Sequence, residues 1–308
     1  MIDISKIVEH ILSNACLINS TGLYYGKAGI ALALFEASEY LKNEDLENEA
    51  YKLIQEALIF KNQDLSFENG LSGIGYTLCY LIENKFIDAD FDEIFGEQYE
   101  KIVKNLEDIE KKPNRLLNVL QAIYFLSAVN RKDERPPKII QKIFEGLELF
   151  LTVQFQDFRD IHYINDKMAV LRIYEIYLKM LNFSGYKHFS PSLLANYAEL
   201  YRTKRLVSSL SIGYYLYILT RENDIQEYQD VIHEQMENGI RNIHAEMLSL
   251  QERIDVTKLV SDMEETLNQK IYSENLLGTI QWNTAPLGYK DGLARLLLLN
   301  VSKKIELL

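Results

Sequence analysis

The hydrophobic pattern alternates between two kinds of helical segment. The segment 44–60 places its apolar residues on one stripe and its charged residues elsewhere, as in a helix with one face in a core. The segment 70–82, GLSGIGYTLCYLI, is apolar on every face, so such a helix has to be surrounded by other protein. The same contrast sets 27–35 and 207–219 (buried type) against 91–107 and 224–242 (amphipathic type). Strand-like alternation is scarce, so the pattern predicts an all-α protein with an inner and an outer ring of helices.

A repeat underlies this alternation. GKAGIALAL at 26–34 aligns with GLSGIGYTL at 70–78, which places Gly29 over Gly73 at a spacing of 44 residues. This period fits seven times into the 308-residue chain. Weaker copies follow, at SSLSIGYYL (208–216) and near Asn118, Lys167 and Gly292.

Repeats of helix pairs also build open solenoids, whose end repeats need polar outer faces. Here the first repeat is strongly apolar, and so is the last, GYKDGLARLLLL at 288–299. The sequence therefore favours a closed α/α toroid, with residues 1–308 as a single domain.

Glycines stand where each loop enters a buried helix. There they can supply unusual φ values and allow backbones to approach closely. An alternative is that helix N-termini gather at one end of the ring and present free N–H groups to a ligand. We favour the packing interpretation, and neither glycine motif has the pattern of a nucleotide loop. The structural glycines are Gly22, Gly26, Gly29, Gly70, Gly73, Gly75, Gly288 and Gly292.

Composition and charge narrow the class of protein. Hydrophobic residues make up 47% and charged residues 25%, the balance of an ordinary globular protein. A net charge of -12 argues against nucleic acid and anionic membranes as partners. We find neither an apolar run of roughly 18 residues nor a signal peptide, and only Cys16 and Cys79 as cysteines. We therefore expect a cytoplasmic protein.

The glycine repeats resemble those of the lanthionine synthetase C-like (LanC-like) family. The resemblance is carried by GLYYGKAGIALAL at 22–34, NGLSGIGYTL at 69–78 and GYKDGLARLL at 288–297. It implies a double ring of seven inner and seven outer helices. It also implies that the site lies at the end of the ring where the glycine loops gather.

Active members of this family hold a zinc ion by two cysteines and a histidine, in Trp-Cys-x-Gly and Cys-His-Gly motifs. This sequence has neither motif. Its cysteines, Cys16 and Cys79, belong to early helices, and its tryptophan, Trp282, is followed by Asn283. The family chemistry adds a substrate thiol to a dehydrated Ser or Thr, and zinc makes the thiolate available. We therefore expect no metal, no cofactor and no zinc-dependent thioether cyclisation.

Several residues are candidates for the site. His162 and Asp166 could act as a base and its orienting carboxylate, but we favour the alternative that Asn165 or Asp166 caps a helix that starts at Met168. Glu68 and Asp291 are further candidates for catalysis. The residues that we expect to bind a ligand at the glycine-loop mouth are Tyr24, Tyr25, Lys27, Asn69, Trp282, Asn283 and Tyr289.

These observations leave several functions open. The first is a zinc-free relative of the cyclases, a pseudoenzyme that binds a peptide substrate or a peptide-modifying enzyme and assists the maturation of a modified peptide. The second is a carbohydrate-active or other enzyme, in which Glu68 and Asp291 act as acid and base if they lie roughly 5 to 10 Å apart. A residual lanthionine cyclase and a pure scaffold are the remaining alternatives.

Overall fold

A computed structural model describes residues 3–59, 63–109, 116–159, 161, 163–186, 188–244, 247–267, 276–277 and 285–302. Over these ranges the chain consists of helices and connecting loops, with no strand, and the prediction of an all-α protein is confirmed. The chain forms two compact units. Unit 1 comprises Met1–Asn105, Ala128–Lys132 and His244–Leu308, and unit 2 comprises Leu106–Ser127 and Asp133–Ile243. The prediction of a single domain stays a prediction.

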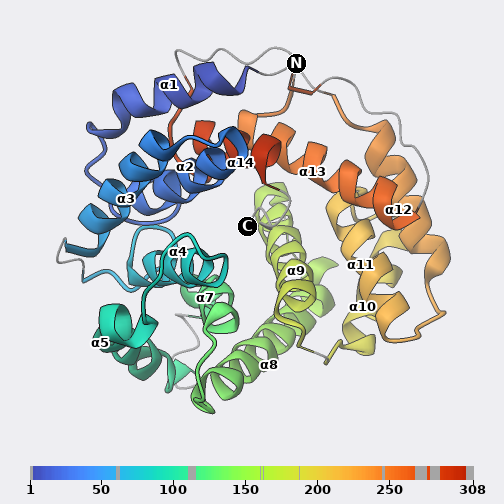
Figure 1. Cartoon of the computed structure of the whole chain (residues 1–308). Coiled ribbons are helices and arrows are strands. Elements are labelled where there is room, and N and C mark those ends of the chain that lie inside the picture. The colour runs from blue at the N-terminus through green and yellow to red at the C-terminus, as the bar shows by residue number, and fades with distance from the viewer. Residues whose placement is uncertain are drawn as a thin grey trace. The chain divides into compact units, whose positions relative to one another are not determined.

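Unit 1 is built around one helix that is buried on all sides, α2. Residues 28–38 of this helix are all buried, and it packs against α1, α3, α4 and α14 (Figure 1). In α3 only one stripe is buried, formed by Leu46, Ala50, Leu53, Ile54 and Ala57. The predicted contrast between the two kinds of helix is confirmed here. The helices of unit 1 are α1 (Ile4–Ala15), α2 (Lys27–Leu41), α3 (Glu44–Ile59), α4 (Leu71–Glu83), α5 (Phe91–Leu106), α13 (Leu250–Leu267) and α14 (Leu293–Val301).

Unit 2 has longer helices and a core rich in tyrosine. The rings of Phe155, Tyr174 and Tyr197 pack together, and α11 lies against both α9 and α12. Two helices start at serine caps, since Ser190 accepts from the N–H of Leu193 and Ser209 from that of Ile212. The helices are α6 (Leu116–Val119), α7 (Ala122–Ala128), α8 (Arg135–Gln156), η3 (Asp157–Arg159), α9 (Ile164–Ser184), α10 (Pro191–Arg202), α11 (Leu210–Glu222) and α12 (Gln229–Arg241).

The start of α9 differs from the prediction. We expected Asn165 or Asp166 to cap a helix beginning at Met168, but α9 begins at Ile164 and its N-cap is Tyr163. The capping prediction is therefore wrong. Asp166 lies inside the first turn, where a carboxylate is stabilised by the positive end of the helix dipole. An acidic residue is favourable both at the N-cap and in the first turn of a helix, so Asp166 alone could not fix where α9 begins.

Three helices of unit 1 begin with the same loop. The N–H of Lys27, the first residue of α2, donates to the carbonyl of Ser20 at 3.0 Å. One 44-residue repeat later, the N–H of Leu71 donates to the carbonyl of Asp64 at 2.8 Å. The equivalent bond before α14 joins Leu293 to Pro286 at 2.8 Å. We call the loops 20–26, 64–70 and 286–292 together the loop cluster.

The backbone joins these loops in a fixed order. The N–H of Lys290 donates to the carbonyl of Tyr24 at 3.1 Å, and the N–H of Tyr24 donates to the carbonyl of Glu68 at 2.9 Å. Each of the three residues stands two places before the glycine that caps its helix. The backbone bond between loops 286–292 and 20–26 is therefore equivalent to the bond between loops 20–26 and 64–70. Within unit 1, the first and last repeats cover one another's apolar residues, since α14 also packs against α2.

The helix-capping glycines have ordinary backbone angles. Gly26, Gly70 and Gly292 have φ values of -125°, -116° and -131°. Over the described ranges, Gly185 is the glycine with a positive φ. The expectation of unusual φ values is therefore wrong for these three positions. Their backbones are extended, a conformation that any residue adopts.

Close approach is what these positions require. A Cβ added to Gly29 would lie 1.9 Å from the carbonyl oxygen of Leu23 and 2.7 Å from the Cβ of Tyr289. At Gly73, it would lie 2.1 Å from the oxygen of Phe67 and 2.8 Å from the Cβ of Leu23. The side chain of one repeat thus occupies the space above the glycine of the next. Backbone atoms also crowd the missing side chains of Gly22, Gly26, Gly70, Gly288 and Gly292, and Gly75 is buried in α4.

Candidate functional site

A lysine crosses the loop cluster. The Nζ of Lys290 lies 3.4 Å from the Oε1 of Glu68, and 4.9 Å from the centroid of the Tyr24 ring. It also lies 5.9 Å from the centroid of Tyr25. Lys290, Tyr24 and Glu68 occupy equivalent positions in loops 286–292, 20–26 and 64–70. Loop 20–26 lies between the other two, so the side chain of Lys290 reaches across it to Glu68. The pair is partly exposed, so its charge attraction is modest and its main effect is to fix the geometry.

Buried rings support this lysine from below. The rings of Tyr24 and Tyr289 are stacked with centroids 6.2 Å apart, and Phe67 meets Tyr24 edge-on at 5.8 Å. Tyr24 is 3% exposed and Tyr289 is 0% exposed. Tyr25 differs, because 40% of it is exposed. Of these described rings, that of Tyr25 is the one that a ligand can reach.

The predicted site residues fall into three groups. Tyr25, Glu68, Asn69 and Asp291 are at least partly exposed on the loop cluster, whereas Tyr24 and Tyr289 are buried beneath it. The remaining predicted residues of unit 1 and unit 2 lie elsewhere or outside the described ranges. Lys27 turns to α3 and pairs with Glu56, Asp166 is exposed in the first turn of α9, and His162, Trp282 and Asn283 lie outside the described residues.

Lys290 was missed by sequence reasoning. Its signal was available, because it stands at the position that Tyr24 holds in the first repeat. What the alignment could not give is its partner, since the contact with Glu68 depends on three loops that are distant in the chain.

The starts of the buried helices do not offer free N–H groups in their first positions. The first N–H of α2, α4 and α14 each donates to a loop carbonyl, as described above. The second does so too in α2 and α14, where Ala28 donates to Thr21 at 3.2 Å and Ala294 to Leu287 at 3.1 Å. An anion at these helix ends would have to compete with bonds that are already made.

A buried arginine marks where the last repeat departs from the others. Arg295 stands where Gly29 and Gly73 stand in the first two repeats, and it is 1% exposed. Its guanidinium pairs with Asp255 of α13 and lies 5.9 Å from the centroid of Tyr289. Burial acts to lower the pKa of Arg295, but the carboxylate of Asp255 offsets this and the pKa is raised. The arginine therefore stays charged and ties α14 to α13.

The described residues do not fit the zinc site of the family. Cys16 is exposed at the end of α1, and Cys79 is buried in α4. Burial raises the pKa of the Cys79 thiol, which disfavours the thiolate that zinc needs. Over the described ranges no three His, Cys, Asp or Glu side chains gather as metal ligands would.

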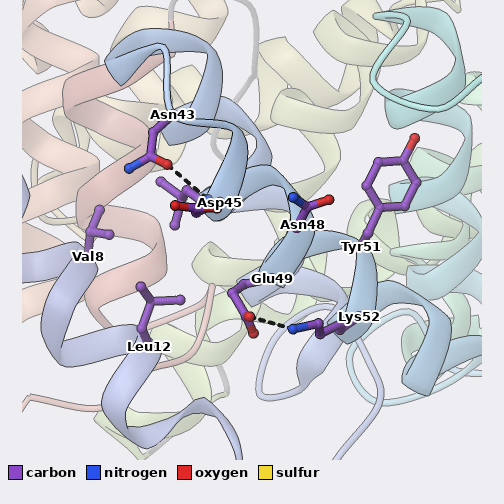
Figure 2. Close-up of a pocket in the computed structure, with 9 residues that line it drawn as sticks. Val8, Leu12, Asn43, Asp45, Asn48, Glu49, Tyr51 and Lys52 are labelled. Carbon is purple, nitrogen blue, oxygen red and sulfur yellow. Dashed lines mark hydrogen bonds and ion pairs between the residues drawn. The ribbon is translucent and has the colours of Figure 1, made fainter.

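A groove of about 660 Å³ lies on another part of unit 1, between α1 and α3 (Figure 2). It contains none of the predicted site residues. Glu49 in its wall pairs with Lys52 at 2.6 Å, so part of its charge is already balanced. The lining residues are Val8, Leu12, Asn43, Asp45, Leu46, Asn48, Glu49, Tyr51 and Lys52.

None of the helices in the described ranges combines the length and apolar character needed to cross a membrane.

These features define a class of protein, namely helical-repeat proteins whose buried helices begin at interlocking glycine loops. Residues 3–146 match the family model described as lanthionine synthetase C-like protein, and this match supports membership of the lanthionine synthetase C-like family. The resemblance predicted from the glycine repeats is confirmed over this range, which includes the first two glycine loops. The family fold is an α/α toroid, with which the all-helical structure is consistent. No curated protein and no solved structure matches the chain.

Proposed function

We propose that this protein binds a peptide at the loop cluster and assists the maturation of a modified peptide without adding thiols by zinc chemistry. The observation that carries this proposal is the partly exposed row of Tyr25, Glu68 and Lys290. A peptide offers N–H and C=O groups together with apolar and charged side chains. An exposed ring beside a fixed ion pair can contact each of these.

The rigidity of the loop cluster supports binding. The backbone bonds from Lys290 to Tyr24 and from Tyr24 to Glu68 hold the three loops in register. Below them, the stacked rings of Tyr24 and Tyr289 are buried. A surface that is already ordered loses little conformational entropy when it binds, so more of the contact energy appears as affinity.

The positions of the two cysteines support the part of the proposal that excludes zinc-dependent thiol addition. The cysteines are not part of loops 20–26, 64–70 or 286–292: Cys16 lies at the end of α1 and Cys79 in α4, where burial raises the pKa of its thiol. The match of residues 3–146 to the lanthionine synthetase C-like model supports a relationship to peptide cyclases. A protein of this family without the ligand motifs can retain the peptide surface and lose the metal.

The proposal is tested by titrating fluorescent peptides into the purified protein, among them a precursor that carries dehydrated Ser and Thr. We expect Tyr25→Ala to weaken binding by about tenfold, which is 1.4 kcal/mol. The matched control is Tyr40→Ala, which removes a ring that is 55% exposed at the far end of α2. Equal binding by both variants would contradict the proposal. So would one tightly bound zinc ion per purified chain.

A further inference from the structure

The groove between α1 and α3 has two walls of different character. Both helices pack against α2, and the groove lies in the space between them (Figure 2). The α1 wall is apolar, because it consists of Val8 and of Leu12, which is 38% exposed. The α3 wall is mostly polar and includes Asp45 and Glu49, which stand four residues apart on one face of the helix. A ligand in this groove therefore meets apolar and polar groups at the same time.

Two polar side chains of the α3 wall are available to a ligand. Asp45 and Asn48 are exposed, and neither side chain has a hydrogen-bond or ion-pair partner among the described residues. Glu49 differs, because it pairs with Lys52 at 2.6 Å. A carboxylate accepts hydrogen bonds from a cation, whereas an amide both donates and accepts, as the backbone of a peptide does. The wall can thus bind a cationic group at Asp45 and a peptide group at Asn48.

The length of the groove fits a short extended segment. From Asp45 to Lys52 the α3 wall rises about 10 Å, at about 1.5 Å per residue. An extended peptide covers this distance with about three residues. Its successive side chains point in opposite directions, so one residue can meet Leu12 while the next meets Asp45.

The charge around the groove favours a cationic partner. Residues 42–52 carry four acidic and two basic side chains, which is an excess of negative charge. The whole chain has a net charge of -12, so repulsion between like charges disfavours a second copy of the chain as the occupant.

We propose that this groove binds an extended peptide segment in which an apolar residue stands next to a lysine or arginine. The apolar side chain contacts Leu12, the cation pairs with Asp45, and the amide of Asn48 pairs with the peptide backbone. The groove shares no residue with the loop cluster. The inference therefore goes beyond the function proposed above and does not depend on it.

The experiment titrates two labelled peptides, Gly-Ser-Leu-Lys-Ser-Gly and Gly-Ser-Leu-Glu-Ser-Gly, into the purified whole chain. The wild-type protein should bind the lysine peptide about tenfold more tightly, because the glutamate peptide replaces an exposed ion pair with repulsion. Asp45→Lys should reverse this preference. The matched control is Glu44→Lys, which makes the same change of charge in the same helical turn but outside the groove lining, and it should keep the preference.

The apolar wall is tested with the same peptides. Leu12→Ala should weaken the binding of both by about threefold, because it removes apolar surface that the leucine of the peptide covers. The matched control is Leu17→Ala, which shortens an apolar side chain that is 70% exposed just after α1 and should change neither affinity. Unchanged binding by Leu12→Ala would overturn the inference.

The other outcomes separate this site from its alternatives. Equal binding of the two peptides by the wild-type protein, or binding of neither, would overturn the inference. A preference that is lost in Tyr25→Ala and kept in Asp45→Lys would assign the peptide to the loop cluster, which supports the proposed function and overturns the groove. Self-association of the wild-type protein that Asp45→Lys abolishes, measured by sedimentation, would assign the groove to a second copy of the chain and would also overturn the inference.

Discussion

A buried carboxylate in the core of unit 1 allows one prediction to be worked out in detail. Glu36 lies in α2 and is 3% exposed, and its carboxylate accepts a hydrogen bond from the hydroxyl of Tyr80 in α4. The two residues stand one 44-residue repeat apart. The pKa of Tyr80 is raised by burial first and by Glu36 second, so the hydroxyl keeps its proton and remains a donor.

Tyr80→Phe removes the donor and leaves the ring in place. A hydrogen bond to a charged group contributes about 1.5 to 3 kcal/mol, and the carboxylate left behind stays buried. We expect the variant to lose about 2 kcal/mol of local stability. Combining it with Glu36→Gln should restore part of this loss, because a neutral amide costs less to bury than an unpaired carboxylate.

Hydrogen exchange at the amides of α2 and α4 is the suitable assay, because two compact units can unfold separately and a single global transition would mix them. A loss of about 2 kcal/mol corresponds to roughly 30-fold faster exchange. The reasoning is refuted if Tyr80→Phe changes exchange by less than about threefold. It is also refuted if the double variant exchanges as fast as the single one.

Three further predictions concern packing, charge and reactivity. Gly73→Ala should lower the Tm strongly, because the new Cβ overlaps a carbonyl oxygen at 2.1 Å, whereas Gly96→Ala, with its nearest atom at 3.9 Å, should gain about 0.5 to 1 kcal/mol. Asp255→Ala should cost about 3 kcal/mol in denaturant unfolding because it removes the carboxylate that pairs with a buried guanidinium, while Arg295→Met should cost less. Alkylation of the folded protein at pH 8 should modify the exposed thiol quickly and Cys79 only after unfolding, since burial raises the pKa of that thiol; equal rates would contradict this.

The alternation of helix types could be predicted from the sequence because a helix without a polar face has no stable position at a surface. This argument holds for α2, where residues 28–38 are all buried, and for the one-sided stripe of α3. The glycine positions were also found, yet one of the two reasons given for them was wrong. Gly26 and Gly70 have extended backbones, so what selects glycine there is the neighbouring backbone and not an unusual φ.

The composition of the candidate site was harder to predict. Tyr24 and Tyr25 are adjacent and identical in type, yet one is 3% exposed and the other 40%. Tyrosine suits both environments, so only the stacking partner of Tyr24, which comes from the far end of the chain, decides between them. The contact of Lys290 with Glu68 and the burial of the Asp291 oxygen also depend on long-range packing, so no local sequence pattern predicts them.

In the loop cluster, backbone groups hold the repeats together, while the side chains are free to differ from one repeat to the next. At Lys290, Tyr24 and Glu68, backbone groups form the bonds that join one repeat to the next. Because N–H and C=O groups are common to all three residues, this joint does not constrain their side chains, which are an ammonium, a phenol and a carboxylate. The glycines beside them, by contrast, are fixed by contact with the adjoining backbone. A chain built in this way can lose metal ligands from its loops and keep its fold. The glycine motifs are therefore reliable guides to the architecture, while the side chains between them determine what the site binds.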